Sequence, residues 1–267
     1  MIVVGDVHGN ISALKDLIDF YLDTCPQERL IFLGDIIDRG QDPFGCVHLL
    51  KNLNALNTEV PIILRGNHEQ LMLDSLDDGW KWETWVHYQN GDTTVKSFFD
   101  GISGVPSRTD FKEMLEQTGW KRFFDSLPFY HEEEIGGKKI LFCHAGIHPD
   151  GNKETNFSRP GQYKLGEDDL SVVWIRDHFF ANPDTPSLLD KLGYEKVFIG
   201  HTPTFSGRTD GFKRLDPDAW CSPKLCCDDR VVMCDTGSGY RQGLLTAVRI
   251  DDNLEVSIAW QEKRVTR

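Results

Sequence analysis

The sequence predicts an α/β fold in which two mixed β-sheets are flanked by helices. Apolar runs alternate with helical patterns over the first 65 residues, which is typical of a βαβαβ unit. A helical and aromatic stretch follows over about 69–130, and apolar runs then return and end in two that alternate like a hairpin. We expect one domain over 1–267 with a helical insert at about 70–130, since 267 residues lie within the range of a single α/β unit.

The first part of the chain supplies three predicted strands and two predicted helices. Short apolar runs over 1–5, 29–34 and 60–65 indicate the strands. Asn10 is the expected N-cap of the first helix, and Pro43 opens the second because proline suits the first helical position. Crossovers between such strands are right-handed, so we expect the three strands to be parallel.

The aromatic residues of the 69–130 region are interpreted as the core of the insert, with a role in gripping substrate as the other interpretation. The region 150–186 lacks apolar periodicity and is expected to carry loops. The last two of the later strands are consecutive, so we expect an antiparallel pair in a second sheet. The later strands are expected over 139–143, 196–199, 230–234, 243–250 and 254–260.

Composition and charge exclude several classes of function. The chain has 29 basic and 42 acidic residues and a net charge of −13, which argues against an overall electrostatic grip on nucleic acid. No run of 18 apolar residues is present, so we expect no membrane span. The seven cysteines show no CxxC spacing and the first strand directly follows Met1, which predicts a reduced, cytoplasmic protein without a secretory signal. Cys226 and Cys227 could bind a soft metal, although no nearby residue completes such a site.

Polar clusters follow the first three strands, and a histidine follows each of two later ones. Open α/β sheets place their ligands at the carboxyl ends of parallel strands, and the flanking glycines let the backbone turn sharply there. A single Asp or His at a strand end is usually a turn or structural residue, but five clusters in order are hard to explain in this way. The clusters are Gly5-Asp6-Val7-His8-Gly9, Gly34-Asp35-Ile36-Ile37-Asp38-Arg39-Gly40, Gly66-Asn67-His68-Glu69, His144-Ala145-Gly146 and Gly200-His201-Thr202-Pro203.

These clusters contain six candidate metal ligands. Imidazole nitrogens with carboxylate or amide oxygens, and no thiolate, favour Mn, Fe, Zn or Co over Ca or Mg. Six ligands are too many for one open catalytic metal, whereas a bridging carboxylate would divide them between two cations, the arrangement used in phosphoryl chemistry. Such a pair would also supply the positive charge that the composition lacks. The six are Asp6, His8, Asp35, Asn67, His144 and His201.

The motifs resemble those of the phosphoprotein phosphatase family of calcineurin-like metallophosphoesterases, over about residues 2–250. The branch of small bacterial and lambda-phage serine/threonine phosphatases is most similar, through the segment 67–72 and Asp235-Thr236-Gly237. The resemblance implies a two-sheet sandwich with two divalent metals, Mn²⁺ above all, bridged by Asp35. Asp6 and His8 would complete the first site. Asn67, His144 and His201 would complete the second.

The resemblance also implies roles for the remaining polar residues. A hydroxide between the two metals would attack phosphorus in line, with His68 as general acid for the leaving alcohol and Asp38 orienting it. Arg39 and Arg176 would bind the phosphate, together with Asn67. Three other arginines could serve in place of Arg176. They are Arg108, Arg159 and Arg208.

The implied function is that of a serine/threonine protein phosphatase, acting on a phosphorylated protein or a small phosphoester. One alternative is symmetrical hydrolysis of diadenosine tetraphosphate, which the tryptophans of the insert favour because they could stack adenine. A second is a catalytically inactive scaffold that binds phosphoproteins. The sequence indicates no oligomeric state, and the region 207–229 matches no motif of the family.

Overall fold

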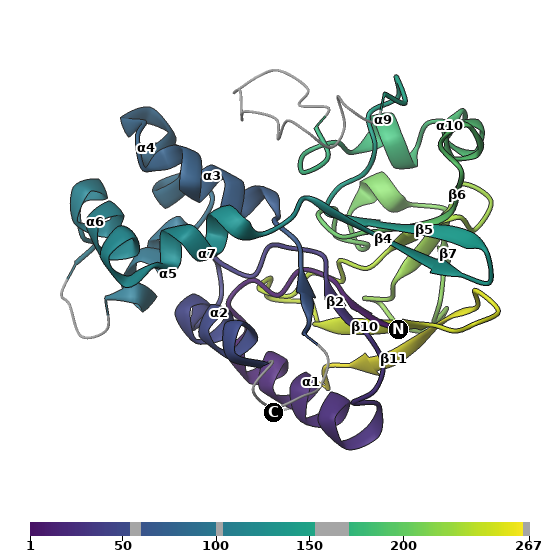
Figure 1. Cartoon of the computed structure of the whole chain (residues 1–267), viewed down its shortest axis with the longest axis horizontal. Helices are drawn as coiled ribbons and strands as arrows, with labels where there is room; N and C mark the ends of the chain where they lie inside the picture. Colours follow the sequence, from purple (N-terminus) through teal and green to yellow (C-terminus); the bar gives the residue numbers. More distant parts are fainter. Residues whose placement is uncertain (54–59, 100–103, 153–170, 264–267) are drawn as a thin grey trace.

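Two β-sheets stack face to face in the computed structural model, which describes residues 1–53, 60–99, 104–152 and 171–263 (Figure 1). Sheet A has the strand order β11-β10-β1-β2-β3, in which β1, β2 and β3 are parallel and β10 and β11 are antiparallel to their neighbours. Its strands are β1 (Ile2–Val4), β2 (Leu30–Phe32), β3 (Ile62–Ile63), β10 (Thr246–Ile250) and β11 (Val256–Gln261).

Sheet B has the order β4-β5-β6-β9-β8-β7, with β5, β6 and β9 parallel and the outer strands antiparallel. The fold class predicted from the sequence, two mixed sheets flanked by helices, is therefore confirmed. The strands of sheet B are β4 (Tyr130–Ile135), β5 (Lys138–Cys143), β6 (Tyr194–Ile199), β7 (Lys213–Arg214), β8 (Lys224–Cys226) and β9 (Val231–Met233).

Helices cover the outer faces of both sheets. Helices α1 (Ile11–Thr24) and α2 (Pro43–Asn52) pack on sheet A, and α9 (Asp177–Phe180) and α10 (Thr185–Leu192) pack on sheet B. The central strands are buried on both sides, which is why they read as continuous apolar runs. In β1, for example, Val3 packs between the sheets while its neighbours face the helices.

The helix starts agree with the sequence. The side chain of Asn10 accepts a hydrogen bond from the Ala13 amide at 3.3 Å, and that of Asp42 accepts one from Gly45 at 2.8 Å. Pro43 occupies the first turn of α2. Both caps hold the helix N-termini beside the ends of β1 and β2.

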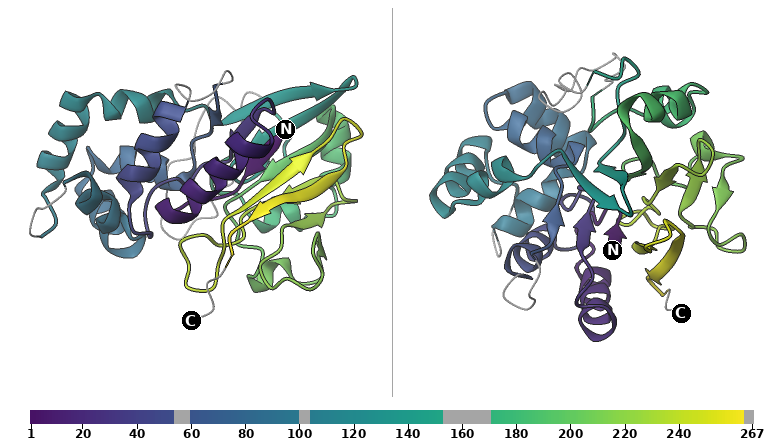
Figure 2. Two further views of the ribbon diagram at one scale, coloured as in Figure 1. Left: turned by 90° about the horizontal axis from the view of Figure 1, so that it is seen from below. Right: turned by 45° about the vertical axis from the view of Figure 1, so that its right-hand side comes forward.

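Helices α3 to α7 gather to one side of the sheets (Figures 1 and 2). Their aromatic residues pack on one another, as in the contact of Trp85 with Phe111, whose ring centroids are 5.7 Å apart. Trp85 and Phe111 are both fully buried, although Trp80 is about half exposed. Most of these aromatic residues thus form the core of this region. The helices are α3 (Asn67–Ser75), α4 (Gly79–Tyr88), α5 (Gly91–Phe98), α6 (Arg108–Thr118) and α7 (Trp120–Ser126).

The structure corrects the expected placement of the final hairpin. Strands β10 and β11 do form an antiparallel pair, but they extend sheet A and do not belong to the second sheet. Val3 pairs with Val248, so β10 lies directly beside β1. Strand β10 is apolar on both faces, with Val248 between the sheets and Ala247 against the helices, which suits the interior of a sheet.

Other elements had no sequence prediction. Strand β4 contains three consecutive glutamates and lies at an edge of sheet B, where two of its six residues, Glu132 and Glu134, are exposed. The region 207–229 carries β7 and β8, and the adjacent Cys226 and Cys227 lie at the end of β8 with their sulfurs 3.8 Å apart. Among the described residues, the clusters that could hold a metal include neither cysteine. No helix in the part of the chain described here combines the length and apolar character needed to cross a membrane.

Candidate metal centre and phosphate site

The six predicted ligands come together in one buried site at the carboxyl ends of β1, β2, β3, β5 and β6. All six side chains are at most 5% exposed. The close packing of these strand ends depends on Gly66, where an added Cβ would lie 2.1 Å from Asp35 Oδ1. The ligands are Asp6, His8, Asp35, Asn67, His144 and His201.

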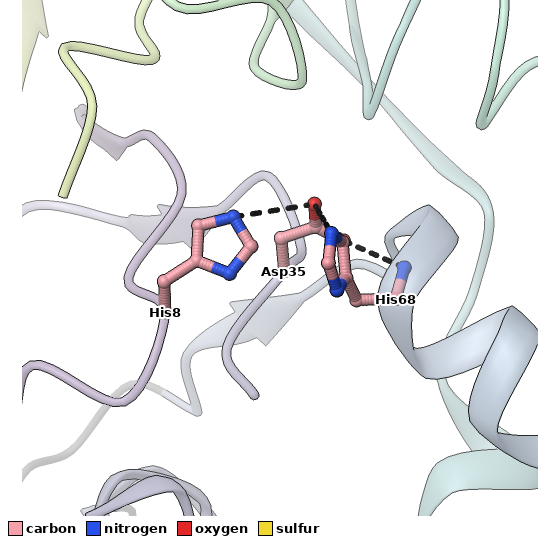
Figure 3. A group of neighbouring side chains, drawn as sticks. All are labelled: His8, Asp35 and His68. Atoms are coloured by element: carbon pink, nitrogen blue, oxygen red, sulfur yellow. Dashed lines mark hydrogen bonds and ion pairs between the residues drawn. The ribbon is translucent and has the colours of Figure 1, made fainter. Parts of the chain in front are cut away.

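Asp35 occupies the centre of this cluster. Its Oδ2 lies 3.6 Å from His8 Nε2 and 3.4 Å from His144 Nε2, so it faces two groups of ligands at once. Its Oδ1 accepts a hydrogen bond from the His68 amide at 3.0 Å. Figure 3 shows Asp35 between the His8 and His68 side chains. A carboxylate in this position can bridge two cations.

Backbone carbonyls orient two of the histidines. His8 Nδ1 lies 2.9 Å from the Ile37 carbonyl, and His144 Nδ1 lies 2.8 Å from the Leu33 carbonyl. We assign the proton of each ring to this nitrogen, because only a donor can bond a carbonyl. The Nε2 lone pair of each ring then faces the cluster, as in metal-ligating histidines.

Asn67, His144 and His201 form a second group of polar atoms that face one another. Asn67 Oδ1 is 2.9 Å from His144 Nε2 and 2.7 Å from His201 Nδ1, while His201 Nε2 faces the Trp174 carbonyl at 3.1 Å. With His201 donating to that carbonyl, an amide oxygen and two imidazole nitrogens point at one another as acceptors. A cation satisfies such a group, so the donor set fits a divalent metal.

Electrostatics favour added positive charge at this point. Without a metal, burial opposes the charged form of His144, but the neighbouring Asp35 and Asp6 carboxylates outweigh it and raise the pKa of the imidazole to about 9, so Nε2 binds a proton that a cation would replace. Burial, followed by the charges of Asp235 and Asp35, raises the pKa of Asp6 well above its ordinary value. Buried carboxylates that repel one another are stabilised by a cation among them.

His68 is held beside this cluster by a buried carboxylate. Its Nδ1 lies 2.6 Å from Asp38 Oδ2, which also accepts a hydrogen bond from Trp85 Nε1 at 2.8 Å. The other oxygen of Asp38 accepts a hydrogen bond from the Thr94 hydroxyl at 2.5 Å. His68, His8 and Asp35 form a possible metal-binding group, yet the bond to Asp38 commits one His68 nitrogen and turns the other toward Arg39. This arrangement suits proton transfer.

Arg39 spans two imidazoles. Its Nη1 lies 2.5 Å from His8 Nε2 and its Nη2 lies 3.1 Å from His68 Nε2. The guanidinium also stacks on the Tyr240 ring, 4.4 Å from the centroid. Asp38 and Arg39, with φ of 70° and 66°, both have left-handed backbones, a strained conformation that is often found at functional sites.

Among the described arginines that could bind phosphate with Arg39, Arg176 lies against the ligands. Its Nη1 donates to the His201 carbonyl at 3.1 Å and to the Thr202 hydroxyl at 2.8 Å. Arg208 instead forms an ion pair with an aspartate of α9, and Arg108 faces a carbonyl at the end of α3. Arg159 lies outside the described residues.

Sequence reasoning gave no role in the site to Glu69 and Thr94, and it assigned Trp85 only to the aromatic residues of the 69–130 region. The Glu69 carboxylate accepts hydrogen bonds at 2.8 to 3.2 Å from four backbone amides, those of Asp35, Ile36, Ile37 and Gly66. These bonds fix the loop that carries Asp35. The position of Glu69 three residues after Gly66 matches the acidic half of a capping box, a signal that could have found it. Trp85 and Thr94 follow Asp38 by 47 and 56 residues, and no local pattern connects them to it.

Replacing Glu69 by alanine is expected to lower the free energy of unfolding by about 1–3 kcal/mol. The substitution leaves buried amide groups without an acceptor. Urea unfolding of metal-free protein measures the effect, and Glu113→Ala on the exposed face of α6 is the matched control. Equal stability of the two variants would show that the Glu69 carboxylate does not hold the loop.

Comparisons with known proteins show the family of this chain. The profile of the calcineurin-like phosphoesterases matches residues 1–205. The chain is 29% identical over 232 residues to serine/threonine-protein phosphatase 2 of Salmonella typhimurium, covering 84% of this chain and 89% of that protein. It is also 30% identical over 151 residues to an uncharacterized protein of Methanocaldococcus jannaschii, covering 55% of this chain and half of that protein.

A solved structure shares the fold. A protein serine/threonine phosphatase from Saccharomyces cerevisiae with similarity to human phosphatase PP5 superposes with a TM-score of 0.56 at 16% identity, covering 100% of this chain and 80% of that one. The profile match covers more than half of the chain and includes all six predicted ligands. The chain therefore belongs to the calcineurin-like phosphoesterase family and is a metal-dependent phosphoric ester hydrolase.

Proposed function

We propose that the protein is a cytoplasmic serine/threonine protein phosphatase that uses two divalent cations, Mn²⁺ above all. The observation that carries this proposal is the placement of His68, with its carboxylate partner Asp38, directly beside Asp35 and Arg39. A general acid and a bidentate anion binder thus face the same buried ligand cluster. That combination suits cleavage of a phosphate monoester whose leaving alcohol needs a proton.

The ligand cluster divides into two groups that share Asp35. Asp6 and His8 would hold one cation with it, and Asn67, His144 and His201 would hold the other. When bound, such a pair supplies hydroxide near neutral pH and neutralises charge on the phosphate. The fixed tautomers of the histidines and the buried position of Asp35 orient the ligands for this purpose.

His68 and Asp38 would handle the proton of the leaving group. The carboxylate of Asp38 binds Nδ1 and fixes the ring, which leaves Nε2, beside the phosphate-binding Arg39, to give a proton to the leaving oxygen. Trp85 and Thr94 fix Asp38 in turn. A serine or threonine alkoxide is a poor leaving group and requires this acid.

Arg39 and Arg176 would bind the phosphate oxygens, with Asn67 nearby. The Arg39 fork already lies over His8 and His68, the two imidazoles between which the reacting group must fit. Arg176 donates a hydrogen bond to the carbonyl of His201, so it lies beside one of the predicted ligands. The planar fork of a guanidinium group can bind two oxygens of a tetrahedral phosphate at once.

The named relative supports a protein substrate, since the Salmonella protein is a serine/threonine-protein phosphatase. Three tryptophans of the 69–130 region, Trp82, Trp85 and Trp120, are at most 8% exposed and cannot present flat faces to adenine, which leaves only the half-exposed Trp80 of this region for such stacking. A scaffold role has no support either, because every expected ligand and the acid are present.

Initial rates of Mn²⁺-loaded protein on a phosphoserine peptide and on diadenosine tetraphosphate test the proposal. A much higher kcat/KM on the peptide is expected. A higher kcat/KM on the dinucleotide would contradict the proposed function. The proposal would also be contradicted if the protein hydrolysed neither compound at saturating Mn²⁺.

Replacing Arg39 by lysine is expected to lower kcat/KM on the peptide by about 10–100-fold. Lysine keeps the charge but loses the second parallel hydrogen bond to phosphate. Steady-state kinetics measure the change, with Arg122→Lys on the exposed side of α7 as control. A kcat/KM equal to that of the control would remove Arg39 from phosphate binding.

A further inference from the structure

Asp235 stands at the edge of the sheets that carries the metal ligands. It comes two residues after the end of β9, and β9 runs parallel to β6 with Ile199 opposite Met233, so Asp235 lies level with His201. The end of β1 passes against it, because an added Cβ at Gly5 would lie 3.1 Å from the Asp235 amide nitrogen. A further parallel strand therefore delivers a polar side chain to the place where Asp6 and His201 lie.

One oxygen of this carboxylate has no partner among the described residues. Asp235 is 1% exposed, its Oδ1 accepts a hydrogen bond from the Gly237 amide at 2.8 Å, and its Oδ2 makes no hydrogen bond. A buried carboxylate oxygen without a donor or cation costs several kcal/mol of free energy, on the order of the desolvation penalty. A cation bound in the site would supply the missing partner.

The loop after Asp235 closes over the His8 side of the ligand cluster. The hydroxyl of Ser238 donates to the Val7 carbonyl at 2.8 Å, and an added Cβ at Gly239 would lie 2.6 Å from the Cβ of His8. Burial raises the pKa of Asp6 most, and the nearby negative charge of Asp235 raises it further. Two buried carboxylates that repel one another become mutually stabilised when a divalent cation lies near both.

We propose that Asp235 is a seventh residue of the metal centre, whose charge and free oxygen strengthen binding of the cation on the Asp6 side. The inference rests on the proposed two-cation site and adds a carboxylate to it. It also explains why a fully buried acid is tolerated at this strand end. The cation is the partner that Oδ2 otherwise lacks.

Titration of metal-free protein with Mn²⁺, by calorimetry and by the electron paramagnetic resonance signal of free Mn²⁺, tests the inference without substrate. Asp235→Asn keeps the shape of the side chain and removes its charge. We expect about 10–100-fold weaker binding at one of the two sites and unchanged binding at the other. Asp252→Asn, which removes an exposed charge from the turn between β10 and β11, should bind Mn²⁺ like the wild type.

Thermal melts separate this role from a structural one. Without metal, Asp235→Asn should melt at or above the wild-type temperature, because it relieves repulsion with Asp6, and Mn²⁺ should raise its melting temperature less. Asp235→Ser, which is smaller, is the second variant and should also bind Mn²⁺ more weakly. Wild-type affinity at both sites in either folded variant would overturn the inference. Failure of the wild type to hydrolyse the phosphoserine peptide would contradict the proposed function alone, since Mn²⁺ binding is measured independently.

Discussion

Replacing His68 by asparagine is expected to lower kcat on a phosphoserine peptide by about 10²–10⁴-fold while both cations remain bound. The imidazole is positioned by Asp38 at 2.6 Å and would protonate the leaving alkoxide. Asparagine fits the same space without supplying an acid of useful pKa. Metal content per chain, measured together with kcat, distinguishes this role from that of a ligand.

The leaving group provides the sharpest control for His68. A nitrophenyl phosphate releases a stable phenolate that needs little protonation, so the variant should lose far less activity on it than on the peptide. His131→Asn, a half-buried histidine of β4 bonded to Glu133, should leave both rates unchanged. An equal loss on the two substrates, or loss of a cation, would show that His68 acts in another way.

Replacing Asp35 by asparagine is expected to leave at most one cation bound per chain and to abolish peptide hydrolysis. The Asp35 carboxylate is the one group that faces both halves of the ligand cluster, at 3.6 Å from His8 and 3.4 Å from His144. An amide oxygen can still accept the hydrogen bond of the His68 amide, so we expect the loop to keep its fold. The neutral amide cannot bridge two cations.

Metal analysis after dialysis against Mn²⁺ measures this effect. Asp16→Asn on the exposed face of α1 removes the same charge far from the ligands and should retain full metal content. Circular dichroism spectra that match the wild type exclude unfolding as the cause. Two tightly bound cations in folded Asp35→Asn would contradict a bridging role.

The sequence was most informative where one strand end supplies one ligand. His144 and His201 each follow a buried apolar run directly, and the geometry of parallel strands brings such ends to one edge without further information. The helix caps at Asn10 and Asp42 could also be predicted from the sequence, because each is a local contact between residues three positions apart. Local patterns and parallel topology together predicted the ligand cluster.

Contacts between distant segments could not be predicted in this way. The support of Asp38 by Trp85 and Thr94 connects β2 with the insert, and neither residue differs in its local pattern from an ordinary helix residue. The prediction that the final hairpin belongs to the second sheet was wrong for a related reason. Periodicity reports which faces of β10 are buried but does not say which strand lies beside it, and Val248 found its partner 245 residues away in Val3.

The pairing of β1 with β10 has a consequence for biosynthesis. Strand β1 is synthesised long before β10, so one of its two edges has no partner until residues near 250 have been made. At about 5–20 residues per second this interval lasts on the order of tens of seconds. During that time an apolar strand end carrying Asp6 and His8 is open to pairing with other chains. The nascent protein therefore depends on α1 and β2 to shield β1 until the last hairpin closes sheet A.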